Sequence, residues 1–99
     1  MKSRTVFFSP EALEDLEHIY DWIADAGSPN AAMAYVQRIE SACRSLDLAS
    51  NRGQARDDIR PGLRTVGFER RLTIAFTVGS ESVTILRIFA GGRDWEGDG

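Results

Sequence analysis

Residues 63–90, which read LRTVGFERRLTIAFTVGSESVTILRIFA, decide the fold. They contain three strand patterns, at about 63–68, 72–78 and 83–90, and the middle pattern alternates between large apolar and smaller side chains. The segment 79–82, GSES, is typical of a hairpin turn. Consecutive strands joined by such short connections predict an antiparallel sheet.

The last of these strands is apolar on both sides. Strict alternation places Val83, Ile85, Arg87 and Phe89 on one face of the strand and Leu86 and Ile88 on the other. Such a strand is expected to lie inside the sheet, or to have one face covered by something other than the chain's own helices. Because Arg87 shares a face with apolar residues, we expect it to meet an ion-pair partner or a carboxylate of another protein.

The first half of the chain predicts one short strand and two helices. Residues 5–8 are β-prone, and Ser9-Pro10-Glu11 is a typical helix start. Apolar spacing predicts one helix up to the breaker at 26–30 and a second helix over about 31–49. The residues expected to face inward are Leu13, Leu16, Ile19, Tyr20 and Ile23, then Ala32, Tyr35, Val36, Ile39, Ala42, Cys43 and Leu46.

The order β-α-α-β-β-β predicts an α+β fold in which a helical hairpin packs on one face of an antiparallel sheet. A chain of 99 residues suits one domain, 1–99, and we expect a flexible tail at about 95–99. No apolar run reaches the roughly 20 residues of a membrane span, and no signal-peptide pattern is present. A single cysteine, Cys43, favours a reducing, cytoplasmic location.

Charge is distributed unevenly along the chain. The net charge is −3, with six acidic residues between 11 and 25 and six arginines between 52 and 71. Proteins that grip nucleic acid are usually basic overall, because phosphate contacts supply most of the affinity. We therefore expect the arginine-rich half to meet an acidic protein surface.

The side chains that could perform chemistry have simpler explanations. His18 falls on the acidic, solvent-facing side of the first helix, and Cys43 falls on an apolar helix face. The carboxylates of the first helix are spread along a solvated face, and no His or Cys joins them at ligand spacing. The sequence therefore predicts no catalytic residue, no cofactor and no metal site.

Three motifs resemble the ParE-type toxins of the RelE/ParE superfamily. They are SPEALEDL at 9–16 followed by Ile19 and Trp22-Ile23, GQARDDIRPGLR at 53–64, and ILRIFAGGRD at 85–94. The resemblance spans residues 6–94. It implies a type II toxin that causes growth arrest by binding and inhibiting DNA gyrase and is neutralised by a ParD-like antitoxin. Such antitoxins dimerise through a DNA-binding domain, so the toxin would meet DNA only indirectly, within a hetero-oligomer.

Two surfaces follow from these expectations. For antitoxin binding we expect the arginines Arg60, Arg64 and Arg87 and the apolar residues Val83, Ile85 and Phe89. For target binding we expect Arg93 and Trp95, because Gly91-Gly92 gives the chain freedom to turn these residues outward.

Two other functions stay open. A RelE-like ribosome-dependent mRNA endonuclease needs a base for the 2′-hydroxyl and a donor for the leaving group. Glu or Asp alone would have to supply both, because Tyr20 and Tyr35 fall in the helices and Lys2 is the only lysine. The third possibility is a partner-binding module without toxicity.

Overall fold

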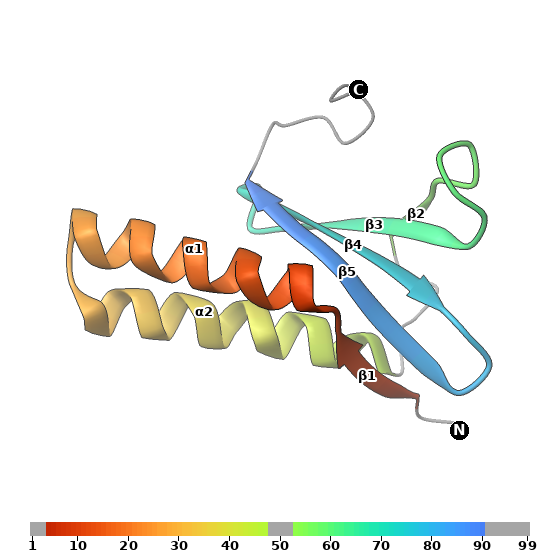
Figure 1. Cartoon of the computed structure of the whole chain (residues 1–99), viewed down its shortest axis with the longest axis horizontal. Helices are drawn as coiled ribbons and strands as arrows, with labels where there is room; N and C mark the ends of the chain where they lie inside the picture. Colours follow the sequence, from red (N-terminus) through yellow and green to blue (C-terminus); the bar gives the residue numbers. More distant parts are fainter. Residues whose placement is uncertain (1–3, 48–52, 91–99) are drawn as a thin grey trace.

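The computed structural model describes residues 4–47 and 53–90, and their arrangement confirms the α+β fold class (Figure 1). The expected tail at 95–99 lies outside the described residues. The elements are β1 (Thr5–Phe8), α1 (Pro10–Ala26), α2 (Pro29–Arg44), the 3-10 turn η1 (Ser45–Asp47), β2 (Gln54–Ala55), β3 (Leu63–Phe68), β4 (Leu72–Val78) and β5 (Ser82–Ala90).

The sheet has five strands in the order β1-β5-β4-β3-β2. The pairs β2–β3, β3–β4 and β4–β5 are antiparallel as predicted, whereas β1 runs parallel to β5, so the sheet is mixed. The prediction that β5 is an internal strand is confirmed, because β1 and β4 flank it. The strand β2 was not predicted, because two residues are too few to show any alternation of side chains.

Both helices begin with the same Ser-Pro device. Ser9 caps α1 by accepting a hydrogen bond from the Ala12 N–H at 3.0 Å, as predicted. Ser28 accepts one from the Ala31 N–H at 3.0 Å, so α2 begins at Pro29, two residues before the predicted start. The break between the helices is therefore only Gly27-Ser28. After Arg44 the chain tightens into η1 instead of continuing as an α-helix to 49.

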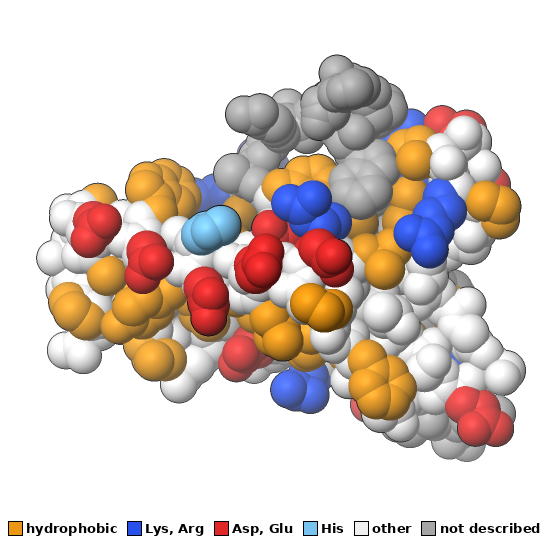
Figure 2. Space-filling view, viewed as in Figure 1, with side chains coloured by type: hydrophobic (Ala, Val, Ile, Leu, Met, Phe, Trp, Pro, Cys, Tyr) orange, Lys and Arg blue, Asp and Glu red, His pale blue; other side chains and the backbone are white. Residues whose placement is uncertain are grey.

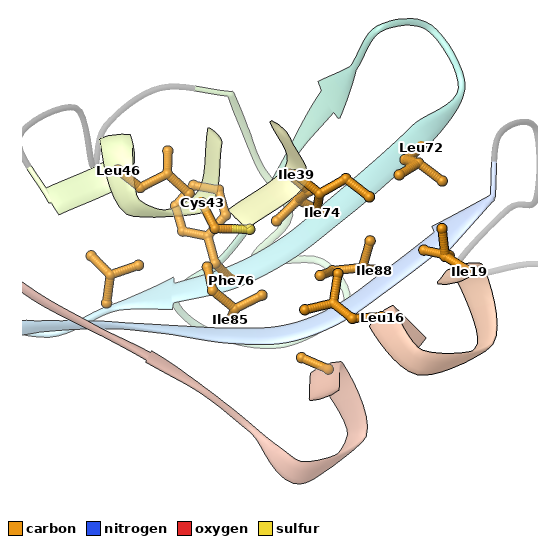
Figure 3. Packing of buried hydrophobic residues seen from close by; sticks show 12 residues of the cluster. Leu16, Ile19, Ile39, Cys43, Leu46, Leu72, Ile74, Phe76, Ile85 and Ile88 are labelled. Carbon is orange, nitrogen blue, oxygen red and sulfur yellow. The ribbon is translucent and has the colours of Figure 1, made fainter. Parts of the chain in front are cut away.

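The core lies between the helical hairpin and one face of the sheet (Figure 3). Its fully or almost fully buried members come from both helices, η1, β4 and β5: Ala12, Leu16, Ile19, Ile39, Cys43, Leu46, Leu72, Ile74, Phe76, Val83, Ile85 and Ile88. The predicted inward position of Leu13 is wrong, because its side chain is 50% exposed while Ala12 is fully buried. The buried stripe of α1 follows 12, 16 and 19, which leaves Leu13 on its flank.

A β-bulge in β5 overturns the predicted alternation. Ala75 of β4 pairs with Arg87, but the next residue, Phe76, pairs with Ile85, so Leu86 is an extra residue between the two pairs. Ile85 before the bulge and Ile88 after it are consequently both buried in the core. Arg87 therefore lies on the face opposite Val83 and Ile85, and not beside them as the sequence analysis expected.

Side chains of α1 cover the edge of β5 beyond the point where β1 ends. The Ser9 N–H donates to the Ile85 carbonyl oxygen at 2.9 Å, and the Ser9 hydroxyl donates to the Leu86 carbonyl oxygen at 2.9 Å. Six residues further along the chain, Asp15 accepts the Ile88 N–H at 2.8 Å. These contacts satisfy backbone groups that a neighbouring strand would otherwise pair, and they hold α1 against the second half of β5.

Candidate protein-binding surface

The side of the sheet turned away from the helices forms a second surface, which we call the helix-free face. Strand register places on it, among others, Leu63, Thr65, Thr73, Ala75, Thr77, Thr84, Arg87 and Phe89, and the exposed Phe7 of β1 pairs with Thr84 on the same face. The four threonines among these residues are all partly exposed, whereas Leu63 and Ala75 are fully buried. Small, partly polar side chains on a sheet leave a shallow surface, which suits a protein partner better than an enclosed small molecule.

Arg87 is the charged centre of this face. Its Nε lies 2.9 Å from Asp15 Oδ2 and its second guanidinium nitrogen lies 3.1 Å from Asp15 Oδ1, a bidentate pair. The hydrogen bond that Arg87 donates to Asp15 raises the pKa of Arg87 above its ordinary value. The Arg87 side chain is nevertheless 45% exposed, while that of Asp15 is only 12% exposed. The guanidinium is thus oriented by α1 and still accessible to a second acceptor.

Phe89 lies two residues further along the same face and contacts this arginine. The Arg87 Cζ lies 5.8 Å from the centroid of the Phe89 ring, which is a cation–π contact. The aromatic ring is partly exposed. An oriented arginine beside a partly exposed aromatic ring is a combination found at the energetic centres of protein interfaces.

The loop between β2 and β3 is held by its own polar side chains. Arg56 forms a bidentate pair with Asp58 at 3.1 and 3.0 Å, and this contact lowers the pKa of the Asp58 carboxyl. Asp57 accepts the Gly62 N–H at 2.9 Å, in a turn where Gly62 has φ +80°. The loop therefore presents Arg60, which is exposed, from a defined backbone.

The start of this loop approaches β3 closely. Gly53 has φ +79°, and a Cβ there would collide with the Thr65 carbonyl oxygen, so no other residue fits without a shift. Arg64 donates to the Gly53 carbonyl oxygen at 3.1 Å and thereby ties the loop to the strand. Arg64 shares a face with Phe76, its cross-strand partner, so it lies on the opposite side of the sheet from Arg87.

The predicted antitoxin-binding residues are therefore divided among four places, one of which is that of Arg64, on the opposite side of the sheet from Arg87. Arg87 and Phe89 lie together on the helix-free face, and Arg60 is exposed in the adjoining loop. Val83 and Ile85 are fully buried under the helices and offer no surface to a partner. The bulge explains this correction, because it separates these two residues from Arg87. Arg93 and Trp95, the predicted target-binding residues, lie outside the described residues.

The two side chains considered for catalysis, His18 and Cys43, lie in different surroundings, one exposed and one in the core. His18 is exposed on α1, and Figure 2 shows it beside the row of acidic side chains along that helix. Burial raises the pKa of the Cys43 thiol to about 12, which leaves it a core side chain. Among residues 4–47 and 53–90 no group of three or more His, Cys, Asp or Glu is arranged to hold a metal ion. In the same part of the chain, no helix is both long and apolar enough to cross a membrane.

Two further residues stand out that sequence reasoning did not assign. Asp15 was placed with the solvated carboxylates, yet it orients Arg87 and accepts a backbone N–H of β5. The only feature of the sequence that could have indicated this role of Asp15 is its position next to the buried stripe of α1. Trp22 is 59% exposed, although tryptophan is usually buried, and it lines a groove of about 520 Å³ beside the β3–β4 turn.

Comparison with known proteins identifies the class. Residues 6–95 match the family model described as the ParE toxin of the type II toxin–antitoxin system parDE. The fold and this match place the chain among the toxins of type II toxin–antitoxin systems. Within that class, the chain belongs to the ParE toxin family.

Individual relatives agree with this assignment. Toxin ParE3 of Caulobacter vibrioides is 32% identical over 77 residues, which covers 78% of this chain and 76% of that protein. A solved structure of the chromosomal ParDE TA system from P. aeruginosa is similar with a TM-score of 0.78 and 30% identity, covering 90% of this chain and 97% of that one. The toxin–antitoxin complex RelBE2 from Mycobacterium tuberculosis contains a chain with the same fold, with a TM-score of 0.63 and 21% identity over 94% of this chain and 97% of that one.

Proposed function

We propose that this ParE-family toxin binds and inhibits DNA gyrase in the cytoplasm, without catalysis, and that a ParD-like antitoxin neutralises it. Family membership supports the toxin role. The observation that carries the binding mode is the helix-free face, where Asp15 orients the accessible guanidinium of Arg87 beside Phe89. An exposed, preorganised Arg–aromatic pair on a shallow surface favours association with a protein.

The antitoxin covers this helix-free face in the proposal. Its acidic or polar groups meet Arg87 and the exposed Arg60, and its apolar side chains pack on Phe89 and the threonines. An interface of standard size buries about 800 Å² on each partner. Co-expression with the neighbouring reading frame is expected to rescue the growth arrest caused by the toxin alone. Arg87→Ala is expected to weaken binding of the purified antitoxin, measured by calorimetry.

The gyrase-binding surface in the proposal includes Arg93 and Trp95, because an arginine and a tryptophan are typical interface anchors. Deletion of residues 93–99 is expected to abolish gyrase inhibition while antitoxin binding and the thermal unfolding midpoint stay unchanged. If the truncated protein inhibits supercoiling as strongly as the full chain, the active surface lies elsewhere and the loop from Arg56 to Arg64 becomes the next candidate.

One pair of assays separates this proposal from an RNA endonuclease. Purified protein is added to gyrase supercoiling and DNA-cleavage reactions and, in parallel, to ribosomes translating an mRNA. We expect inhibition of gyrase and intact mRNA. The variant His18→Ala is expected to remain fully toxic, because the only histidine is exposed on α1 and belongs to neither proposed binding surface. Loss of toxicity in a folded His18→Ala protein, or ribosome-dependent mRNA cleavage, would favour the endonuclease.

A further inference from the structure

A second surface lies where the helical hairpin meets the β3–β4 turn, and we call it the hairpin groove. Its volume is about 520 Å³, and its walls include Trp22 and Ile23 of α1, Tyr35 and Arg38 of α2, and Glu69 and Arg71 of the turn. The walls are mainly apolar, and the charged residues gather on the side formed by Arg38 and the turn. This volume is enough for a few side chains of a docked segment.

Trp22 is the apolar anchor of the groove and is not required by the core. Its side chain is 59% exposed, although a tryptophan offers one of the largest apolar surfaces of any residue. It does not belong to the buried cluster or to the apolar residues packed against that cluster. An indole held on a helix at the lip of a groove is a typical hot spot for a partner.

Side-chain contacts connect the residues of the opposite wall. Arg38 lies 5.0 Å from the centroid of the Tyr35 ring and forms a bidentate pair with Glu69 at 3.1 and 3.0 Å. Tyr35 in turn makes an edge-to-face contact with Phe68, with ring centroids 5.9 Å apart. Contacts in series therefore connect α2 to the end of β3, so the groove is preformed before any partner arrives.

The turn that completes this wall has an unusual backbone. Glu69 and Arg70 have φ of +51° and +60°, a left-handed conformation that Asn or Gly would adopt at lower cost. This backbone lets Glu69 reach back to Arg38. Within the described residues, Arg71 makes no side-chain hydrogen bond or ion pair, although its exposed guanidinium lies on the groove. The groove thus combines an exposed indole with an arginine whose side-chain N–H groups make no hydrogen bond within the described residues.

We propose that the hairpin groove binds a short segment of the antitoxin that places a large apolar side chain against Trp22 and a carboxylate against Arg71. This inference rests on the proposed function. Charge supports a carboxylate at this point, since Arg38 forms the ion pair with Glu69, while Arg71 acts on Glu69 only through space and makes no side-chain hydrogen bond or ion pair among the described residues. An RNA strand fits the site less well, because the exposed carboxylates Asp21 and Asp25 flank Trp22 in the sequence of α1 and would repel a run of phosphates.

Strand register connects this groove to the helix-free face. Phe89 pairs with Thr73, and Ala90 pairs with Leu72, directly beside the turn that carries Arg71. A segment that leaves the helix-free face at Phe89 therefore has to cross only the end of β3 and β4 to reach the groove. One continuous antitoxin segment can occupy both surfaces, which raises its total affinity through the effective concentration of the second contact.

The test measures the affinity of the full-length toxin for the protein encoded by the adjacent reading frame, by calorimetry. Trp22→Ala is expected to weaken binding at least about 30-fold, the loss typical of a hot-spot tryptophan. Arg71→Glu is expected to weaken it about tenfold, with a smaller loss at high salt. Leu13→Ala and Arg44→Glu are the matched controls, because Leu13 is 50% exposed and Arg44 is exposed at the other end of α2, and both should stay within about twofold.

A second measurement reports on the indole itself. In a Trp95→Phe background Trp22 is the only tryptophan, and its emission is expected to shift to the blue when the partner binds. If Arg87→Ala weakens binding while Trp22→Ala and the emission show no change, the groove proposal is wrong and the proposed function survives. If the wild-type toxin binds no such partner, both fail. If Trp22→Ala instead converts a dimer of the toxin into a monomer, the occupant is a second copy and the groove proposal is also overturned.

Discussion

The helix-covered face and the helix-free face of the sheet carry opposite kinds of side chain. Under the helices, Ile74, Phe76, Ile85 and Ile88 are at most 2% exposed. On the other face, threonines surround the exposed Arg87 and the partly exposed Phe89. Apolar burial stabilises a fold in proportion to the area removed from water, whereas recognition needs groups that a partner can still reach.

The same strand, β5, supplies both kinds of residue, and the bulge at Leu86 determines which face each side chain lies on. Without it, Arg87 would point toward the core together with Ile85, and Ile88 would point away. Residues that stabilise the fold and residues available to a partner are therefore distinct here, although they are neighbours in sequence. The following measurements test whether the two faces contribute separately to stability and to binding.

The largest effect is expected from a matched pair of phenylalanines. Phe76→Ala removes a fully buried ring from the helix-covered face and should lower the free energy of unfolding by about 3–5 kcal/mol. Phe89→Ala removes a ring from the helix-free face and should cost only about 1 kcal/mol, while it weakens antitoxin binding. Urea unfolding of both variants measures the difference. Equal losses of stability would show that the two faces are not separable.

A smaller loss is expected when the link between α1 and the helix-free face is cut. Asp15→Asn keeps the shape but removes the charge that pairs with Arg87, and it should cost about 1–3 kcal/mol in urea unfolding. The control Glu14→Gln changes an exposed neighbour on the same helix and should stay within about 0.5 kcal/mol. A neutral Asp15→Asn in both stability and antitoxin affinity would mean that Arg87 needs no orientation.

Cys43 tests how tightly the helix-covered face is closed. Because burial raises the pKa of its thiol to about 12, the reactive thiolate is rare in the native protein at pH 8. We expect a disulfide reagent to modify the native protein far more slowly than the urea-unfolded chain. Cys43→Ser should cost about 1–2 kcal/mol. Rapid modification of the native protein would indicate that this face opens readily.

The weakest effect is a pH dependence at the hairpin groove. The hydrogen bond from Arg38 lowers the pKa of the exposed Glu69 carboxyl below its ordinary value. The pair therefore contributes to stability above the ordinary pKa of a glutamate, and this contribution is lost as the pH falls through the lower, folded-state pKa. A carboxyl titration followed by NMR should show the low pKa in the wild type and a higher one in Arg38→Gln. Identical titrations would mean that the pair does not persist in solution.

Much of the fold can be read from local patterns. The Ser9-Pro10 start of α1, the apolar spacing of α1 and α2 and the bounds of β3 and β4 follow from capping, side-chain periodicity and turn residues, whereas the start of α2 at Pro29 does not, since the sequence predicts a helix break at Ser28-Pro29. The site is less predictable. Arg87 and Phe89 can be singled out as unusual, but their distance from Val83 and Ile85 cannot, because a single extra residue in a strand leaves composition and spacing almost unchanged.

Sequence patterns were enough to predict the order of most elements, the burial of Cys43, the exposure of His18 and the family resemblance, because each depends on short stretches of the chain. The packed fold was needed to establish that β1 runs parallel to β5, that Leu86 forms a bulge, and that Asp15 lies 2.9 Å from the Nε of Arg87. The packed fold also placed Trp22 and Arg71 on the walls of the same groove. These contacts join residues far apart in sequence, and they form only when the helices and the sheet have packed together.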